Sequence, residues 1–282
     1  MSIHRLEPKS VVKPWGRCDL AAPFTSNGKE RIGEVWFTDP ASMSEPLLVK
    51  YLFTSEKLSV QVHPDDPQAR AAGLAGGKSE CWLVLEAEPD AVLGIGLIRH
   101  VDEQALRRAM EDGTIEDLMD WKPVRPGSFY YIPAGTIHAI GAGIKLVEIQ
   151  QNNDVTYRLY DYGRPRELHL EEGIAVSSLH PYTMPDRLVA SRTSEVLLDG
   201  SSSPFALESL VVGERGRRRL PAACLFIPIE GRGVIDGQTW QAGECWAVGS
   251  AAYLEAARST RALVAYQPQS ASAAGMRIAS AD

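Results

Sequence analysis

Apolar and polar residues alternate with a period of two along most of this chain, in short runs separated by Gly, Pro, Asn and Asp. The runs recur at intervals of about ten residues, which is the spacing of antiparallel sandwiches. The sequence therefore predicts an all-β fold, and two jelly-roll units account for its length. The strands expected in the first half cover residues 33–37, 47–53, 58–63, 80–85, 91–96, 128–132, 136–140, 145–150 and 156–160.

A different pattern occupies residues 101–121. Asp102 opens it, and apolar Leu106, Ala109 and Met110 recur at three- and four-residue spacing. This pattern predicts a short amphipathic helix. Further helices are expected around residues 115–119 and 169–178, whereas the Gly-containing stretch 64–77 is expected to be a loop.

The order of these patterns suggests two units. We expect a first β unit over residues 1–185, interrupted by the helical segment 101–121, and a second over residues 186–268. The Ser- and Ala-rich residues 269–282 are expected to form a flexible tail.

Composition narrows the function classes. The chain has 282 residues, 44% of them hydrophobic, and a formal net charge of −7, which argues against a nucleic-acid surface. Its four cysteines form no CxxC pair, and no apolar run is long enough to span a bilayer. We expect a soluble cytoplasmic protein that acts as a monomer and has neither nucleic acid nor membrane as a partner.

One stretch carries candidate metal chemistry. Gln61 and His63 lie two positions apart on an expected strand, so both side chains leave the same face, and Pro64 ends the strand. Glu80 and His138 follow at the ends of later strands. Nitrogen and oxygen ligands of this kind suit zinc, although manganese, iron and cobalt remain compatible.

Five segments resemble those of one enzyme family. They are Lys13–Gly16, Leu58–Asp66, Gly77–Trp82, Pro133–His138 and Gln150–Tyr162. In this order they are similar to the motifs of type I phosphomannose isomerases, and the resemblance covers roughly residues 10–175. The family has the cupin fold, a jelly-roll β-barrel that is duplicated in its longer members.

The resemblance implies a metal-dependent aldose–ketose isomerase that interconverts mannose 6-phosphate and fructose 6-phosphate through an enediolate. It implies one zinc ion per chain, bound by Gln61, His63, Glu80 and His138, and a sugar phosphate as the small-molecule partner. The short helical segment 101–121 resembles the compact bacterial branch. Beyond residue 186 no ligand histidine follows, so the second unit is expected to be a degenerate cupin without a metal.

The resemblance also implies the reacting groups. Glu148 shares a strand face with Leu146 and Gln150, and it matches an active-site carboxylate that could serve as the general base. Arg158 matches the family's catalytic arginine, whose planar fork suits an enediolate or a phosphate. Lys78 lies on the face of Glu80 and could orient a hydroxyl or move a proton.

Ser59 and Arg164 match positions that bind phosphate in the family. With Arg166 nearby, the segment that begins at Arg158 could present three guanidiniums to a dianion. Asp154 and Asp161 are interpreted as caps at strand ends.

Two alternative functions remain open on the residues alone. A cupin metal oxygenase would use the same fold, but such sites are richer in histidine. A sugar-phosphate-binding cupin without turnover would keep the pocket, but it would not need Lys78, Glu148 and Arg158 together.

Overall fold

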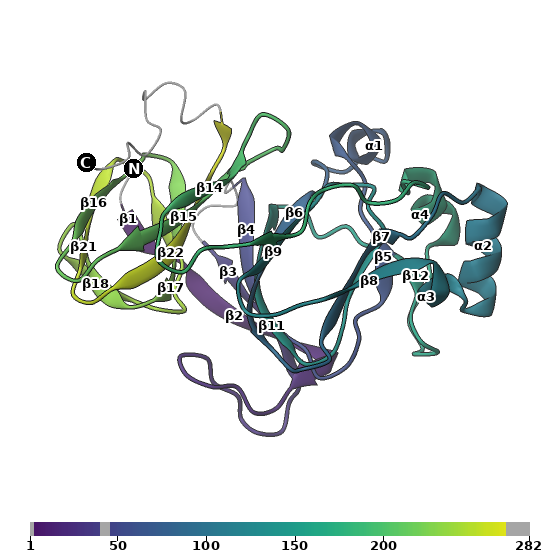
Figure 1. Ribbon diagram of the computed structural model, residues 1–282, viewed down its shortest axis with the longest axis horizontal. Coiled ribbons are helices and arrows are strands. Elements are labelled where there is room, and N and C mark those ends of the chain that lie inside the picture. Colours follow the sequence, from purple (N-terminus) through teal and green to yellow (C-terminus); the bar gives the residue numbers. More distant parts are fainter. Residues whose placement is uncertain (1–2, 40–45, 269–282) are drawn as a thin grey trace.

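The computed structural model describes residues 3–39 and 46–268. Its strands pair antiparallel into four sheets, and these stack face to face along the long axis of the molecule (Figure 1). The layers follow in the order four-stranded, six-stranded, seven-stranded and five-stranded sheet, and helices cover the last. The prediction of an all-β fold built from two sandwiches with a short helical insertion is confirmed; within the described residues the sheets form sandwiches without a closed barrel.

The seven-stranded sheet lies at the centre of the molecule and is buried on both faces. Along β11, Val147 and Ile149 face the second unit, whereas Leu146 faces the five-stranded sheet. The alternation follows from the pleat, which sends successive side chains to opposite faces. In spatial order its strands are β13 (Arg187–Leu188), β9 (Ser128–Ile132), β6 (Glu80–Ala87), β11 (Ile144–Gln151), β4 (Leu47–Phe53), β3 (Ile32–Thr38) and β2 (Glu7–Arg17).

The five-stranded sheet closes the first sandwich. Trp82 and Leu146 of the central sheet pack with Leu93 and Ile140 of this sheet in one apolar cluster. Burying side chains of this size contributes about 1.5–3 kcal/mol each. Its strands are β12 (Tyr157–Tyr160), β5 (Val60–Val62), β10 (His138–Ile140), β7 (Val92–Leu97) and β8 (Met119–Pro123).

Three helices cover the outer face of this sheet: α2 (Glu103–Asp112), α3 (Ile115–Leu118) and α4 (Leu170–Val176). The Asp102 side chain accepts a hydrogen bond from the Ala105 N–H and caps α2, as the sequence predicted. Leu106 packs against Val62 of the sheet. The predicted helix around residues 115–119 is shorter than expected, because the chain turns into strand β8 at Met119. None of the described helices is long and apolar enough to cross a membrane.

The prediction of a plain loop over residues 64–77 is wrong in one respect, because it contains helix α1 (Asp66–Ala71). The Asp65 side chain accepts from the Gln68 N–H, and the Gln68 side chain accepts from the Asp65 N–H. This is a capping box, and proline stands in the first turn, so the local sequence does contain the signal for a helix.

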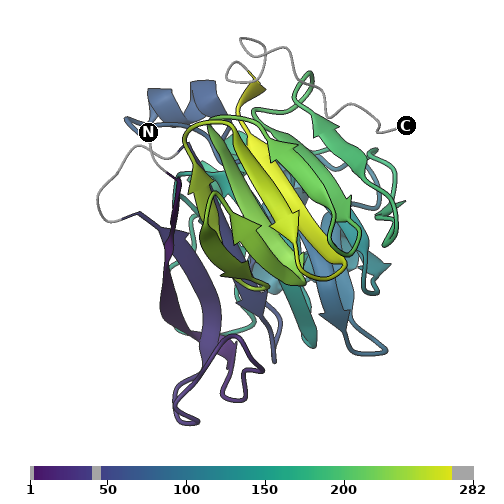
Figure 2. The ribbon, with the colours of Figure 1, turned by 90° about the vertical axis from the view of Figure 1, so that its left-hand side faces the viewer.

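The six-stranded sheet of the second unit packs against the central sheet. In Figure 2 the second unit faces the viewer. Strand β1, at the start of the chain, pairs with β20 of this sheet, whereas β13 pairs with β9 of the first unit. The six strands are β1 (Ile3–Arg5), β20 (Trp246–Val248), β17 (Cys224–Glu230), β22 (Thr260–Tyr266), β15 (Ala206–Val212) and β14 (Glu195–Asp199). The outer sheet contains β16 (Arg217–Leu220), β21 (Ala252–Ala256), β18 (Arg232–Ile235) and β19 (Gln238–Gln241). The predicted tail, residues 269–282, lies outside the described residues.

Candidate metal centre and active-site cavity

The predicted metal ligands come together between the two sheets of the first sandwich. Gln61 lies on β5, and His138 pairs directly with it from β10, while His63 follows β5 by one residue. Glu80 is the first residue of β6 in the facing sheet. One ligand atom each from His63, Glu80 and His138 lies within 4.8 Å of the others, and all three side chains are buried.

The geometry of these three residues suits a cation. Glu80 Oε1 is 3.4 Å from His138 Nε2, and Glu80 Oε2 is 3.4 Å from His63 Nε2. Among the described residues, neither carboxylate oxygen of Glu80 has a hydrogen-bond donor. A buried carboxylate is costly unless a positive charge compensates it; Lys78 Nζ, 3.3 Å from Oε2, supplies one such charge, and a bound cation would supply another. Two imidazole nitrogens and a carboxylate facing one point are ligands that a divalent metal accepts.

Both histidines are held in the state that a metal requires. Burial, together with the nearby Lys78 charge, lowers the pKa of His63 to about 3. Burial also lowers the pKa of His138, whose Nδ1–H donates to the Thr136 carbonyl at 2.8 Å. That hydrogen bond fixes the tautomer and leaves a lone pair on Nε2.

Glu80 remains ionised in this setting. Burial would raise the pKa of its carboxyl, but the charge of the nearby Lys78 ammonium outweighs that effect and holds the pKa well below its ordinary value. The site therefore offers one negative charge and two neutral nitrogens.

Gln61 borders this cluster through its side-chain amide. Its Nε2 lies 3.3 Å from His138 Nε2, and the Ser59 hydroxyl donates to its Oε1 at 3.4 Å. Rotating the amide by half a turn exchanges the two atoms and directs the oxygen toward His138. The Gln61 amide therefore borders the cluster, and its role as a fourth ligand stays a prediction.

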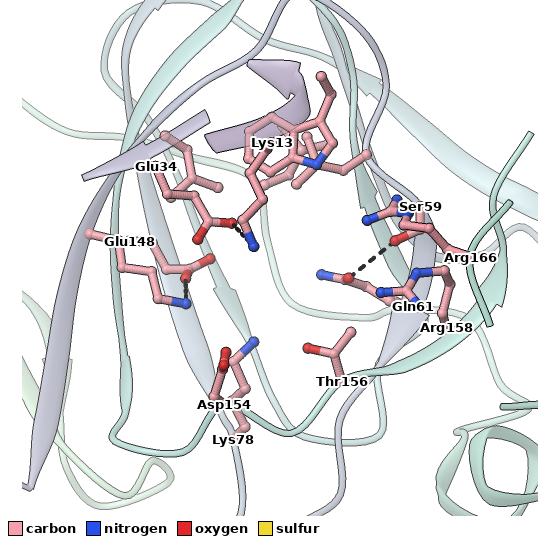
Figure 3. Close-up of a pocket in the computed structure, with 15 residues that line it drawn as sticks. Lys13, Glu34, Ser59, Gln61, Lys78, Glu148, Asp154, Thr156, Arg158 and Arg166 are labelled. Carbon is pink, nitrogen blue, oxygen red and sulfur yellow. Dashed lines mark hydrogen bonds and ion pairs between the residues drawn. The ribbon is translucent and has the colours of Figure 1, made fainter. Parts of the chain in front are cut away.

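A cavity of about 260 Å³ opens beside this cluster. Figure 3 shows Glu34 and Glu148 on one side of it and Ser59, Gln61, Arg158 and Arg166 on the other. The cavity therefore has a carboxylate side and a guanidinium side. Its lining consists of Lys13, Trp15, Glu34, Lys50, Leu52, Leu58, Ser59, Gln61, Lys78, Ile140, Glu148, Asp154, Thr156, Arg158 and Arg166.

Glu148 lies on the face of β11 that turns toward the cavity, where the resemblance implied an active-site carboxylate. Lys50, its partner across the sheet register, places Nζ 3.1 Å from Glu148 Oε1. Trp82 Nε1 donates to Oε2 at 3.0 Å. Burial raises the pKa of Glu148, as does the nearby Glu80 charge, while Lys50 opposes the shift. A carboxylate with a raised pKa facing a polar cavity is suited to general base catalysis.

Lys78 and Arg158 also face the cavity. Lys78 is buried, with Nζ 3.0 Å from His63 Nε2 and 3.3 Å from Glu80 Oε2. Arg158 donates from Nη1 to the Glu167 carbonyl at 2.7 Å, but within the described chain it has no carboxylate partner, and its buried Nε has no acceptor. Burial lowers the pKa of Arg158, and the neighbouring Arg166 adds to the effect.

The two predicted phosphate ligands are placed differently. Ser59 lines the cavity, whereas Arg164 does not. Asp161, which we interpreted as a strand-end cap, instead accepts hydrogen bonds from both Arg164 and Arg166. Asp154, the other predicted cap, lines the cavity.

Among the charged lining residues, sequence reasoning did not assign Lys13, Glu34 or Lys50 to the site. Lys50 is the only charged residue in the otherwise apolar strand Leu47–Phe53. A lysine at such a position is rarely buried without a partner, so it could have pointed to a buried carboxylate. Lys13 Nζ lies 3.4 Å from Glu34 Oε1. No sequence pattern indicates this ion pair, because the two strands meet only in the folded sheet.

Replacing Lys50 with methionine is expected to shift the pH dependence of the proposed activity. The Lys50 ammonium lowers the pKa of Glu148, so its removal raises that pKa further and moves the acidic limb of the kcat/KM profile to higher pH. Lys145→Met is the matched control, because Lys145 lies on the same strand as Glu148 but pairs with the exposed Glu86. An unchanged acidic limb in Lys50→Met would show that Glu148 does not govern the rate.

Comparison with known proteins shows which proteins this chain is similar to. No family profile matches the sequence. Mannose-6-phosphate isomerase ManA of Bacillus subtilis is 38% identical over 197 residues, which are 60% of this chain and 62% of that protein. The mannose-6-phosphate isomerase of Streptococcus mutans is 41% identical over 149 residues, which are 51% of this chain and 47% of that protein. The alignments thus span less than two thirds of either relative's length.

Solved structures extend the similarity along the chain. The crystal structure of the mannose 6-phosphate isomerase from Bacillus subtilis superposes with a TM-score of 0.77 at 25% identity, over 94% of this chain and 100% of that one. A zinc-bound mannose 6-phosphate isomerase has the same fold, with a TM-score of 0.72 at 15% identity, over 95% of this chain and 100% of that one. The predicted resemblance to phosphomannose isomerases is confirmed.

Proposed function

We propose that this chain is a metal-dependent mannose-6-phosphate isomerase, since it is similar in sequence and fold to proteins of that name. The observation that carries the proposal is the buried His63–Glu80–His138 cluster beside a cavity that also holds Lys78, Glu148 and Arg158. An aldose–ketose isomerase needs a base, a cation near the sugar oxygens and a site that orients the open chain. Each requirement has a matching side chain in this cavity.

The ion of the proposal is zinc, one per chain, with other divalent metals as substitutes. His63, Glu80 and His138 would hold it, with Gln61 as the fourth ligand. One neighbour in fold was crystallised with zinc, and the donor set fits that ion. When bound, the metal would act as a Lewis acid toward the sugar oxygens.

The chain's own residues would divide the remaining work. Glu148 would take a proton from one sugar carbon, C1 or C2, and return it to the other. Arg158, which has no carboxylate partner within the described chain, would stabilise the negative charge that develops on O1 and O2. Lys78 would donate a hydrogen bond to a sugar oxygen and help move its proton.

The guanidinium side of the cavity suits the anionic end of the substrate. Ser59 lines this side and has a hydroxyl to donate. The assignment of Ser59 and Arg164 as phosphate ligands stays a prediction, and only Ser59 lies in the cavity wall.

The proposal also covers the organisation and setting of the chain. Residues 1–185 would form the catalytic unit, and residues 186–268 a supporting one without metal ligands. We expect the protein to act as a monomer. The described cysteines form no disulfide, as is usual for cytoplasmic proteins, so we place the enzyme there. The partner would be a sugar phosphate, with neither nucleic acid nor membrane involved.

A coupled assay tests the function directly. Purified protein supplied with zinc is expected to convert mannose 6-phosphate into fructose 6-phosphate, to lose this activity with a chelator and to recover it when zinc is restored. A protein that binds the sugar phosphate without converting it would instead be the non-catalytic binder. Consumption of dioxygen with iron loaded, but no isomerisation, would identify a cupin oxygenase.

A further inference from the structure

The segment that follows β12 places two arginines around one buried carboxylate. Asp161 ends the strand, and Tyr162 and Gly163 then adopt left-handed backbone conformations, with φ of 54° and 75°. The Arg164 N–H closes the turn on the Asp161 carbonyl at 3.0 Å. A tyrosine in this region of φ is strained, and such strain persists where surrounding contacts hold it. The turn therefore sets the directions of the side chains that follow.

Arg164 is committed to structural contacts. Its Nε donates to Asp161 Oδ1 at 3.0 Å, and its Nη2 donates to the Lys57 carbonyl at 2.8 Å. Its guanidinium also lies over the Tyr162 ring, 5.4 Å from the centroid. These contacts tie the turn to the segment before β5, and Arg164 is absent from the cavity wall.

Arg166 uses the same carboxylate but lies at the cavity. Its Nε donates to Asp161 Oδ2 at 2.5 Å, and its Nη2 to Oδ1 at 2.6 Å. Within the described chain no hydrogen bond engages Nη1. Figure 3 shows Arg166 beside Ser59, on the side opposite Glu148.

The charges of the cavity favour an anion on that side. The lining contains five cationic side chains and three carboxylates. Lys13 pairs with Glu34, and Lys50 with Glu148, both away from the guanidinium side. Arg158 has no carboxylate partner in the described chain, and the carboxylate that pairs with Arg166 lies outside the lining.

We propose that Arg166, and not Arg164, is the cation that binds the phosphate group of the substrate, and that Asp161 is the residue that positions it. The inference rests on the proposed function and departs from the family pattern, which points to Arg164. The bidentate pair with Asp161 holds the guanidinium in one orientation, so less side-chain entropy is lost when an anion binds. This contact is the same in the ground and transition states, so its loss affects KM and not kcat.

The test compares two variants, Arg166→Ala and Arg164→Ala. Each removes one arginine side chain that pairs with Asp161, so Arg164→Ala is the matched control. Calorimetry on zinc-loaded protein would measure binding of mannose 6-phosphate and of inorganic phosphate, and steady-state kinetics would separate KM from kcat. Arg166→Ala is expected to weaken both ligands and raise KM by at least about tenfold, with kcat unchanged, because a charge-assisted contact is lost. Arg164→Ala is expected to change binding by less than about threefold while lowering the melting temperature.

Two further variants separate positioning from general destabilisation. Arg166→Lys is expected to restore part of the affinity, and Asp161→Asn to weaken phosphate binding in the same direction as Arg166→Ala. Arg107→Ala is the control, because Arg107 forms only an exposed pair with Glu171 on another face. Equal losses in Arg164→Ala and Arg166→Ala, or normal affinity in Arg166→Ala, would overturn the assignment.

The experiment distinguishes a failure of this inference from a failure of the proposed function. If the wild-type protein binds phosphate through Arg166 but does not turn over, the subsite stands and the isomerase proposal fails. If the wild-type protein isomerises mannose 6-phosphate and Arg166→Ala has an unchanged KM, the isomerase proposal stands and this inference fails.

Discussion

Replacing Glu80 with glutamine is expected to abolish both the proposed metal binding and the proposed isomerase activity. Glu80 is the only carboxylate of the cluster, and its two buried oxygens face the two histidine nitrogens. Without its charge, two neutral imidazoles and an amide retain a divalent ion poorly. Elemental analysis is expected to fall from close to one zinc per chain to near zero, and His63→Ala and His138→Ala should behave in the same way.

Glu208→Gln is the matched control for this experiment. Glu208, like Glu80, is a buried glutamate, but it lies in the second unit and accepts a hydrogen bond from the Tyr266 hydroxyl. Burial raises the pKa of its carboxyl. Its neutralisation should leave the metal content unchanged. If Glu80→Gln and His63→Ala both retained a full complement of zinc, the ion would have to be bound elsewhere.

Arg158→Ala is expected to lower kcat by about 10²- to 10³-fold while the zinc content stays normal. The reason is that Arg158 lies at the cavity without a carboxylate partner in the described chain, so its charge is available to an enediolate. Charge that develops only in the transition state is reflected in kcat. Arg158→Lys should recover only part of the loss, since an ammonium lacks the planar fork.

Single-turnover and steady-state rates measured on the wild-type protein, Arg158→Ala and Arg158→Lys would decide the role of Arg158. A near-normal kcat with a raised KM in Arg158→Ala would instead make Arg158 a phosphate ligand. The cation at the reaction centre would then have to be Lys78, the other cation beside the metal ligands.

Local alternation predicted the faces of the strands correctly. Glu148 shares the cavity-facing side of β11 with Leu146, while Val147 faces the opposite cluster. The same rule placed Gln61 and His63 together, because the period of two is a property of an extended chain and needs no partner. Alternation therefore predicted this half of the candidate ligand set, whereas the assignment of Glu80 and His138 came from the order of the motifs and the family resemblance.

Pairings between distant strands could not be predicted in this way. Lys50 lies opposite Glu148 because β4 and β11 pair in one particular register. Strand β1 likewise pairs with β20, which lies far from it in the sequence. Such register depends on which faces the complete core buries. A lysine in an apolar strand indicates that a partner exists without identifying it.

The sequence by itself determined the all-β class and the helical insertion, since these follow from periodicity and residue chemistry within single segments, and its motifs supplied the candidate metal ligands. Only the tertiary structure decided which of two arginines, two positions apart, reaches the cavity. The left-handed turn at Tyr162 and Gly163 and the buried Asp161 direct Arg164 toward the Lys57 backbone and Arg166 toward Ser59. Direction after a turn depends on contacts from elsewhere in the chain, and the spacing of residues does not contain that information.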